Sequence, residues 1–213
     1  VDAIINYTVL LGWSPGDTRE FFTLKELEQV FGIEGIGKAP AIFDINKLNW
    51  FNGEYIRRMD PDDFHRAALP YYEGVITNKA IDTRKVSKLL QVRTELLSSI
   101  PSNIDFFEKL PEYDKTLYEH KKMKTDEHIA IKSLRAVLPV LESITDWNEQ
   151  TLHDALMELV LKLGVKNGQL LWPIRIAITG KEISPGGAIE VAGILGKEET
   201  LKRIKAGIEK LTS

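Results

Sequence analysis

The stretch QLLWPIRIAITGKEISPGGAIEVAGILG, residues 169–196, decides the fold, because it predicts two short apolar helices joined by a tight turn. In its first half, apolar residues recur at helical spacing, and Thr179-Gly180 is a typical helix end. Arg175 lies beside this apolar stripe. The stretch therefore places one cation next to the exposed backbone at the start of a second helix.

The second half of the stretch begins a helix with few side chains over its backbone. Ser184 is a typical N-cap, Pro185 fits the first helical position, and Gly186-Gly187 leave the first-turn N–H groups uncovered. Free N–H groups at a helix terminus can bind a phosphate or approach the edge of a base. An ordinary capped helix after a turn is the alternative interpretation.

Helix start signals recur along the rest of the chain. A capping side chain precedes an apolar helical pattern at Thr23 (with Glu26), Asp44, Asp60 (with Pro61), Asp82 and Asn148. We expect the helix from Asp44 to break at Asn52-Gly53. The last helix is amphipathic, and its polar face is expected to carry Lys202, Arg203, Lys205 and Lys210. Because convincing alternating strands are absent, the predicted fold class is all-α, with short capped helices in two or three small bundles.

One arginine falls within an apolar pattern. The helix that starts near Ile81-Asp82 is expected to carry a stripe of Val86, Leu89, Leu90 and Leu97. At about 100° per residue, Arg93 lies inside that stripe. A guanidinium there must extend to solvent, pair with an acid or serve a ligand, because an unpaired buried charge is costly.

The composition narrows the possible functions. The 213 residues include no cysteine, which excludes disulfides and thiolate metal sites, and the four histidines lack paired metal-ligand spacing, so we assign no metal. No apolar run approaches the roughly twenty residues of a membrane span, and no signal-peptide pattern is present, so we expect a cytoplasmic protein. The net charge of -3 argues against a wholly basic surface, but nucleic-acid binding needs only a local one.

The motifs of common catalytic sites are missing from the sequence. There is no Gly-rich phosphate loop, no nucleophile elbow and no histidine with a plausible serine or cysteine partner. We therefore assign no catalytic residue and interpret the chain as a binding part. Arginines and exposed aromatic residues, such as Trp50 and Trp172, suit stacking on unpaired bases.

Three runs of the sequence resemble the C-terminal half of bacterial glutamyl-tRNA synthetase. They are LLGWSPGDTREFFTLKELEQVF (10–31), FDINKLNWFNGEYIR (43–57) and LLWPIRIAITGKEISPGGAIEVAGILG (170–196). The resemblance covers essentially the whole chain. It implies a stem-contact region at residues 1–62, followed by a helical anticodon-binding domain in two parts, at residues 63–124 and 125–213.

The resemblance also implies an activity for the whole enzyme. Members of that family are class I aminoacyl-tRNA synthetases, which attach glutamate to tRNA(Glu) using ATP with Mg, through a glutamyl-adenylate. Their His-x-Gly-His and Lys-Met-Ser-Lys-Ser signatures for ATP are absent here, and Lys122-Met123-Lys124 is only a superficial echo. The chain then lacks the catalytic domain, as a truncated form or proteolytic remnant would, and is expected to bind tRNA without a cofactor and without catalysis.

The resemblance assigns roles to residues on two helices before the opening stretch. Arg93 occupies the position of an arginine that contacts the third anticodon base, which is cytosine in tRNA(Glu) and guanine in tRNA(Gln). A guanidinium donates to the acceptors of cytosine and is poorly placed against the donor edge of guanine. Lys47 and Trp50 match the helix that contacts the tRNA stem.

Within the opening stretch, the resemblance assigns contacts with the other two anticodon bases. Arg175 and the turn at Ser184-Pro185 match those contacts. Gly187 departs from the family pattern, because some members place a bulkier apolar residue there, which puts packing on the base in doubt.

Two other functions stay open at this point. A helical protein-interaction module would suit the acidic net charge and the amphipathic last helix. A stand-alone tRNA-binding accessory protein is the other alternative. On the synthetase interpretation, the chain is expected to be a monomer whose partner is tRNA(Glu), with no membrane and no DNA partner.

Overall fold

The computed structural model describes residues 1–38 and 40–212, and across them it confirms the all-α prediction. The α-helices are α1 (Asp2–Gly12), α2 (Leu24–Val30), α3 (Ile45–Arg58), α4 (Pro61–Tyr72), α5 (Thr83–Gln91), α6 (Ile100–Glu108), α7 (Glu127–Ser143), α8 (Glu149–Leu163), α9 (Asn167–Thr179), α10 (Ala188–Leu195) and α11 (Lys197–Thr212). Short 3-10 helices lie at η1 (Ile33–Gly35), η2 (Leu97–Ser99) and η3 (Lys115–Tyr118). Extended pairing in the described residues is limited to two isolated bridges, Trp13 with Ile36 and His120 with Thr125.

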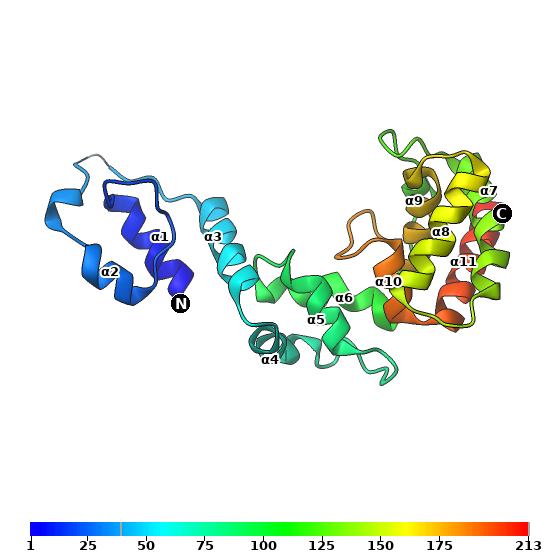
Figure 1. The fold of residues 1–213 in the computed structure, drawn as a ribbon, viewed down its shortest axis with the longest axis horizontal. Coiled ribbons are helices and arrows are strands. Elements are labelled where there is room, and N and C mark those ends of the chain that lie inside the picture. Colours follow the sequence, from blue (N-terminus) through cyan, green and yellow to red (C-terminus); the bar gives the residue numbers. More distant parts are fainter. Residues whose placement is uncertain (39, 213) are drawn as a thin grey trace.

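The molecule is elongated, with its helices in three successive groups. Figure 1 shows α1 and α2 at one end, α3 leading into α4–α6 in the middle, and α7–α11 packed as a bundle at the other end. Trp13, Phe22 and Leu27 form a small core at the first end. A second, much larger core runs from Ile56 to Leu211 and joins the middle group to the bundle. The predicted boundaries at residues 62 and 124 stay predictions.

The five predicted N-caps are confirmed, because each capping side chain accepts a hydrogen bond from the first helical turn. Thr23 and Glu26 form a reciprocal capping box, and Asn148 forms one with Thr151. The remaining caps are those of α3, α4 and α5, at Asp44, Asp60 and Asp82. A capping side chain supplies an acceptor to an N–H group that has no partner inside the helix, so the local sequence suffices to start these helices.

Two predicted helix ends are wrong, one because of a contact distant in sequence and one because of hydrogen bonds within the last turn. α3 continues through Asn52-Gly53 to Arg58, since the Asn52 side chain donates to the Glu95 carbonyl and the buried Gly53 packs beside the Glu95 side chain. α5 ends earlier than its apolar pattern predicts. The backbone N–H of Arg93 and the hydroxyl of Thr94 both donate to the Leu90 carbonyl, at 2.8 and 2.9 Å, and turn the chain away from the helix.

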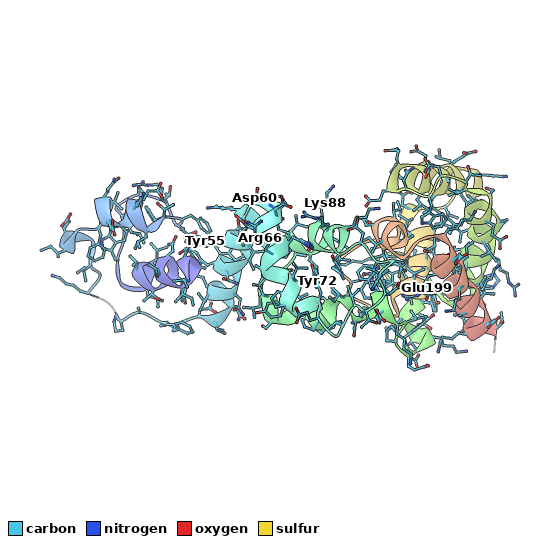
Figure 2. The ribbon with its side chains drawn as sticks, turned by 90° about the horizontal axis from the view of Figure 1, so that it is seen from below. Tyr55, Asp60, Arg66, Tyr72, Lys88 and Glu199 are labelled. Atoms are coloured by element: carbon cyan, nitrogen blue, oxygen red, sulfur yellow. The ribbon has the colours of Figure 1, made fainter. Side chains whose placement is uncertain are left out.

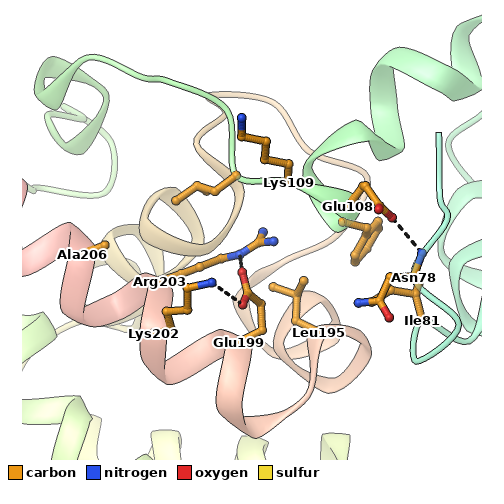
Figure 3. Close-up of a pocket in the computed structure, with 11 residues that line it drawn as sticks. Asn78, Ile81, Glu108, Lys109, Leu195, Glu199, Lys202, Arg203 and Ala206 are labelled. Carbon is orange, nitrogen blue, oxygen red and sulfur yellow. Dashed lines mark hydrogen bonds and ion pairs between the residues drawn. The ribbon is translucent and has the colours of Figure 1, made fainter. Parts of the chain in front are cut away.

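The prediction that Arg203 lies on the exposed polar face of the last helix is wrong, because its side chain is buried. Only 2% of its surface is exposed. Its Nη1 donates to the carbonyls of Phe106 and Ile178, both at 2.7 Å, and its Nε donates to Glu199 at 2.7 Å. Figure 3 shows Arg203 and Glu199 side by side on α11, facing the end of α6. The guanidinium therefore ties α11 to the C-terminal ends of both α6 and α9.

Gly180 ends α9 in the left-handed backbone region, at φ 63°, and it also lies in a close contact. A Cβ atom at Gly180 would lie 2.9 Å from Cδ1 of Tyr113 and 3.0 Å from Cγ of Pro111. Gly164 ends α8 at the same φ, but a Cβ atom there would meet nothing within 4 Å. Substitutions at the two glycines therefore allow the cost of backbone strain to be distinguished from the cost of steric crowding.

We predict that Gly180→Ala destabilises the chain more than Gly164→Ala. The control substitution carries only the left-handed strain of a non-glycine residue, about 1–2 kcal/mol. Gly180→Ala adds the displacement of two packed rings, so its loss of unfolding free energy in urea should be clearly larger. Equal losses of unfolding free energy in the two variants would show that crowding against Tyr113 and Pro111 does not destabilise the chain.

Candidate nucleic-acid interface

Arg175 organises the loop between α9 and α10. Its Nη1 donates to Oγ of Ser184 at 3.0 Å, its Nη2 donates to the Glu182 carbonyl at 2.7 Å, and its guanidinium lies 4.3 Å from the Trp172 ring centre. Burial lowers the pKa of Arg175 from its ordinary value, and the charge of Glu182 opposes this change. An arginine stays protonated at neutral pH, so the loop is fixed around a positive charge.

Ser184 and Pro185 do not begin the second helix, so that prediction is wrong. α10 begins at Ala188, with Gly187 at the N-cap position. The Ser184 hydroxyl is already committed, because it accepts from Arg175 and donates to the Gly186 carbonyl at 2.8 Å. Pro185 is buried in the loop. The first-turn N–H groups of α10 therefore follow Gly187 directly.

A mainly apolar hollow of about 310 Å³ is lined by both Arg175 and Gly187. Its wall consists of Met123, Gly168, Leu171, Trp172, Arg175, Gly187, Ala188, Ile189 and Glu190. The prediction that Trp172 is an exposed aromatic residue is wrong. Only 8% of its surface is exposed, and its indole N–H donates to the Leu117 carbonyl at 2.9 Å. The buried Trp172 ring thus packs against the guanidinium of Arg175.

Arg93 lines a second hollow, of about 240 Å³, where α5 meets α8 and α10. Its side chain is exposed, and its Nη1 lies 3.4 Å from the Leu89 carbonyl. The hollow is lined by Lys85, Lys88, Leu89, Arg93, Glu149, Glu190 and Ile194. Lys88, labelled in Figure 2, projects from α5 in the middle of the molecule. Arg93 is therefore a surface cation among other cations, and not a charge on a packed apolar face.

Glu190 belongs to the walls of both hollows, so the two lie next to each other. Its carboxylate folds back over Gly187, where an added Cβ atom would lie 2.8 Å from Oε2. A larger residue at Gly187 would displace this side chain. The structure thus brings Arg93, Arg175 and Gly187 around one acidic side chain that the sequence prediction did not include.

Lys47 and Trp50 lie on α3, away from the two hollows. Lys47 Nζ is 3.3 Å from Oε1 of Glu20 and 5.8 Å from the Phe51 ring centre. Trp50 is 39% exposed and contacts the rings of Phe21 and Phe51. Their surface is therefore separate from that of the arginines.

No group of three or more His, Cys, Asp or Glu side chains in residues 1–38 and 40–212 is placed to hold a metal ion. No helix in this part of the chain is long and apolar enough to cross a membrane.

The chain belongs to the anticodon binding domain family, whose sequence profile matches residues 63–208. Its relatives include the glutamate--tRNA ligase of Clostridium tetani, which is 60% identical over 210 residues, and that of Clostridium acetobutylicum, which is 50% identical over 210 residues. Each alignment covers 99% of this chain and 43% of the relative. The chain thus spans less than half the length of these relatives.

A solved structure supports the same relationship. The crystal structure of a glutamate tRNA ligase from Elizabethkingia meningosepticum, in complex with its amino acid, superposes with a TM-score of 0.76 at 25% sequence identity. The superposition covers 99% of this chain and 41% of that structure. The resemblance to glutamyl-tRNA synthetases is therefore confirmed, whereas the roles of individual residues stay predictions.

We predict that Arg175→Lys loosens the loop between α9 and α10 without unfolding the bundle. A lysine keeps the charge but cannot donate to Ser184 and Glu182 from one planar group. Hydrogen–deuterium exchange should become faster at residues 182–187, with little change in the melting temperature. Arg135→Lys, at an exposed position on α7, is the matched control and should leave exchange in the loop unchanged. Unchanged loop exchange in Arg175→Lys would contradict the role of the guanidinium.

Proposed function

We propose that this chain binds the anticodon arm of tRNA(Glu) at the two adjacent hollows. The observation that supports the proposal most directly is the placement of Arg93 and Arg175 on either side of Glu190, within a fold of the anticodon binding domain family. A single-stranded loop presents unstacked bases whose edges can enter such hollows. Lys85 and Lys88 add positive charge for the neighbouring phosphates.

Arg93 is proposed to select the third anticodon base. It is exposed, and it lies at the mouth of a hollow with two lysines and the Glu190 carboxylate. A guanidinium has donors only, so it can bond to the acceptors of cytosine and meets the N–H donors of guanine unfavourably. Arg175 and Gly187 are proposed to face the other two bases, with Trp172 behind them as an apolar wall.

We propose that the loop between α9 and α10 contributes to tRNA binding mainly by shaping the hollow. Ser184 is engaged by Arg175 and Pro185 is buried, so we propose that they shape the hollow, with base contact falling mainly to Arg175 and to the start of α10. Lys47 and Trp50 are proposed to contact the tRNA stem. Both are accessible on α3, at the opposite side of the middle helices from the bundle.

For the whole protein we propose attachment of glutamate to tRNA(Glu) with ATP and Mg, as a class I synthetase. The two ATP signatures of that family are missing from this sequence, and the described residues offer no acidic cluster for the metal. We therefore derive no catalytic step here, and this chain alone is proposed to be inactive. A cytoplasmic location, a monomeric state and the absence of a DNA partner are parts of the same proposal.

The second candidate function is a protein-interaction module, and exposed apolar side chains favour it. Val1, Ile33 and Ile42 are 91%, 81% and 86% exposed, all in the first group of helices and the segments beside it. Exposed apolar side chains that form a contiguous surface mark an interface with another protein or with the rest of a longer one. Such a surface can coexist with RNA binding at the bundle, because the two regions lie at opposite ends of the molecule.

We predict that the chain binds tRNA(Glu) more tightly than the same tRNA with guanine as the third anticodon base. A specific base contact discriminates by about 1–3 kcal/mol. Arg93→Gln should remove most of this difference and leave the melting temperature unchanged, because the side chain is exposed. Filter binding or fluorescence anisotropy measures both affinities, and Arg135→Gln is the control for loss of one positive charge. Equal affinities of the unaltered chain for the two tRNAs would exclude base selection by Arg93.

A salt titration separates the two candidate functions. Neutralising about four phosphates should weaken RNA binding roughly 50- to 150-fold between about 50 and 200 mM salt, through release of counterions. An apolar protein interface should change little over that range. A flat salt dependence of tRNA binding would therefore count against the proposed interface.

A further inference from the structure

The loop between α9 and α10 contacts both hollows, and one lysine fastens it to the middle helices. Lys181 Nζ lies 2.5 Å from Oδ1 of Asp105 and donates to the Ser102 carbonyl at 2.5 Å, both on α6. Its ammonium is also 5.9 Å from the Phe106 ring centre. The Lys181 side chain is 22% exposed and the Asp105 side chain is 51% exposed, so the lysine end of this ion pair is the more shielded from solvent.

The loop that begins at Lys181 also contacts Arg175 and, through Leu89, the neighbourhood of Arg93. The carbonyl of Glu182, directly after Lys181, accepts from Arg175. Further along the loop, Gly186 packs on α5 so closely that a Cβ atom would lie 2.9 Å from both methyl groups of Leu89. The carbonyl of Leu89 in turn lies 3.4 Å from Nη1 of Arg93. One short loop therefore connects Lys181 with both candidate base-contacting side chains.

The helices under the loop are fixed by a second contact. Arg203 bonds to the carbonyls of Phe106 and Ile178, next to Asp105 on α6 and near Lys181 after α9. Figure 3 shows Arg203 and its ion pair with Glu199 in the wall of the hollow that Asn78, Lys109 and Lys202 also line. With α6 and α9 held together in this way, Lys181 fastens the loop to α6 and Arg175 fastens it to α9.

We propose that Lys181 is a positioning residue for anticodon specificity: its contact with α6 sets the spacing between the hollow of Arg93 and the hollow of Arg175. The inference rests on the proposed function. Two neighbouring bases of one RNA can be read together only if the two groups that contact them keep a fixed separation. Lys181 itself need not touch the RNA.

The experiment compares Lys181→Met with Lys162→Met, an exposed lysine on α8 with no recorded partner among the described residues. Methionine keeps an unbranched apolar stem and removes the ammonium. Each variant is titrated with tRNA(Glu) and with its counterpart carrying guanine as the third anticodon base. The ratio of the two affinities is the readout, because a lost phosphate contact weakens both complexes equally and cancels.

We expect Lys181→Met to reduce this ratio about 2- to 30-fold, the range measured for residues that couple two sites. Lys162→Met should leave the ratio unchanged, and Lys181→Arg, which keeps a cation, should restore most of it. If Lys181→Met lowers the melting temperature, Asp105→Ala removes the carboxylate from α6 and should give a smaller reduction in the same direction, because Lys181 keeps its bond to the Ser102 carbonyl. An unchanged ratio in both variants, with a discriminating unaltered chain, would overturn the inference.

A second readout needs no RNA and separates the inference from the proposed function. Hydrogen–deuterium exchange in Lys181→Met should become faster both at residues 182–187 and at residues 89–94 around Arg93. Faster exchange in the first segment alone would overturn the coupling of the hollows. Equal affinities of the unaltered chain for the two tRNAs, with faster exchange in both segments, would instead overturn the proposed base selection and keep the coupling.

Discussion

The buried charge of Arg203 is the constraint on which the arrangement of the helices depends. Removing a guanidinium from water is costly unless its donors are satisfied, and here they bond to the last-turn carbonyls of α6 and α9. Those carbonyls have no partner within their helices. Burial raises the pKa of Glu199, but the hydrogen bonds and charges of Arg203 and Lys202 lower it by more. The pKa therefore lies below its ordinary value, and the carboxylate stays ionised. The buried guanidinium of Arg203 therefore needs these carbonyls as acceptors, and the carbonyls need it as a donor.

Local chemistry in the sequence predicts where the helices start, but the ends of α3 and α5 depend on hydrogen bonds that the apolar pattern does not reveal. The caps at Thr23, Asp60 and Asn148 act on N–H groups two or three residues away, so short-range patterns suffice. The end of α5 could not be predicted in the same way. Arg93 fits the apolar period of the preceding helix, yet Thr94 bonds to the Leu90 carbonyl and the helix stops first.

The candidate interface was predicted in part. Sequence and resemblance indicated Arg93, Arg175 and Gly187, and the structure places them around two adjacent hollows. Glu190 was missed, although its position three residues after a glycine N-cap is a recognisable signal for a carboxylate over the first turn. Lys181 could not be found from sequence, because its partner Asp105 precedes it by more than seventy residues. Such pairings become visible only when the helices are packed.

The stretch from 169 to 196 thus forms one wall of the candidate interface, and the end of α5 forms the other. The central claim is that this interface encloses the anticodon. Hydroxyl-radical footprinting of tRNA(Glu) with the 213-residue chain tests it most directly. The account predicts protection of the three anticodon nucleotides, with weaker protection along the adjoining stem. Protection confined to other parts of the tRNA, or no protection at saturating protein, would contradict it.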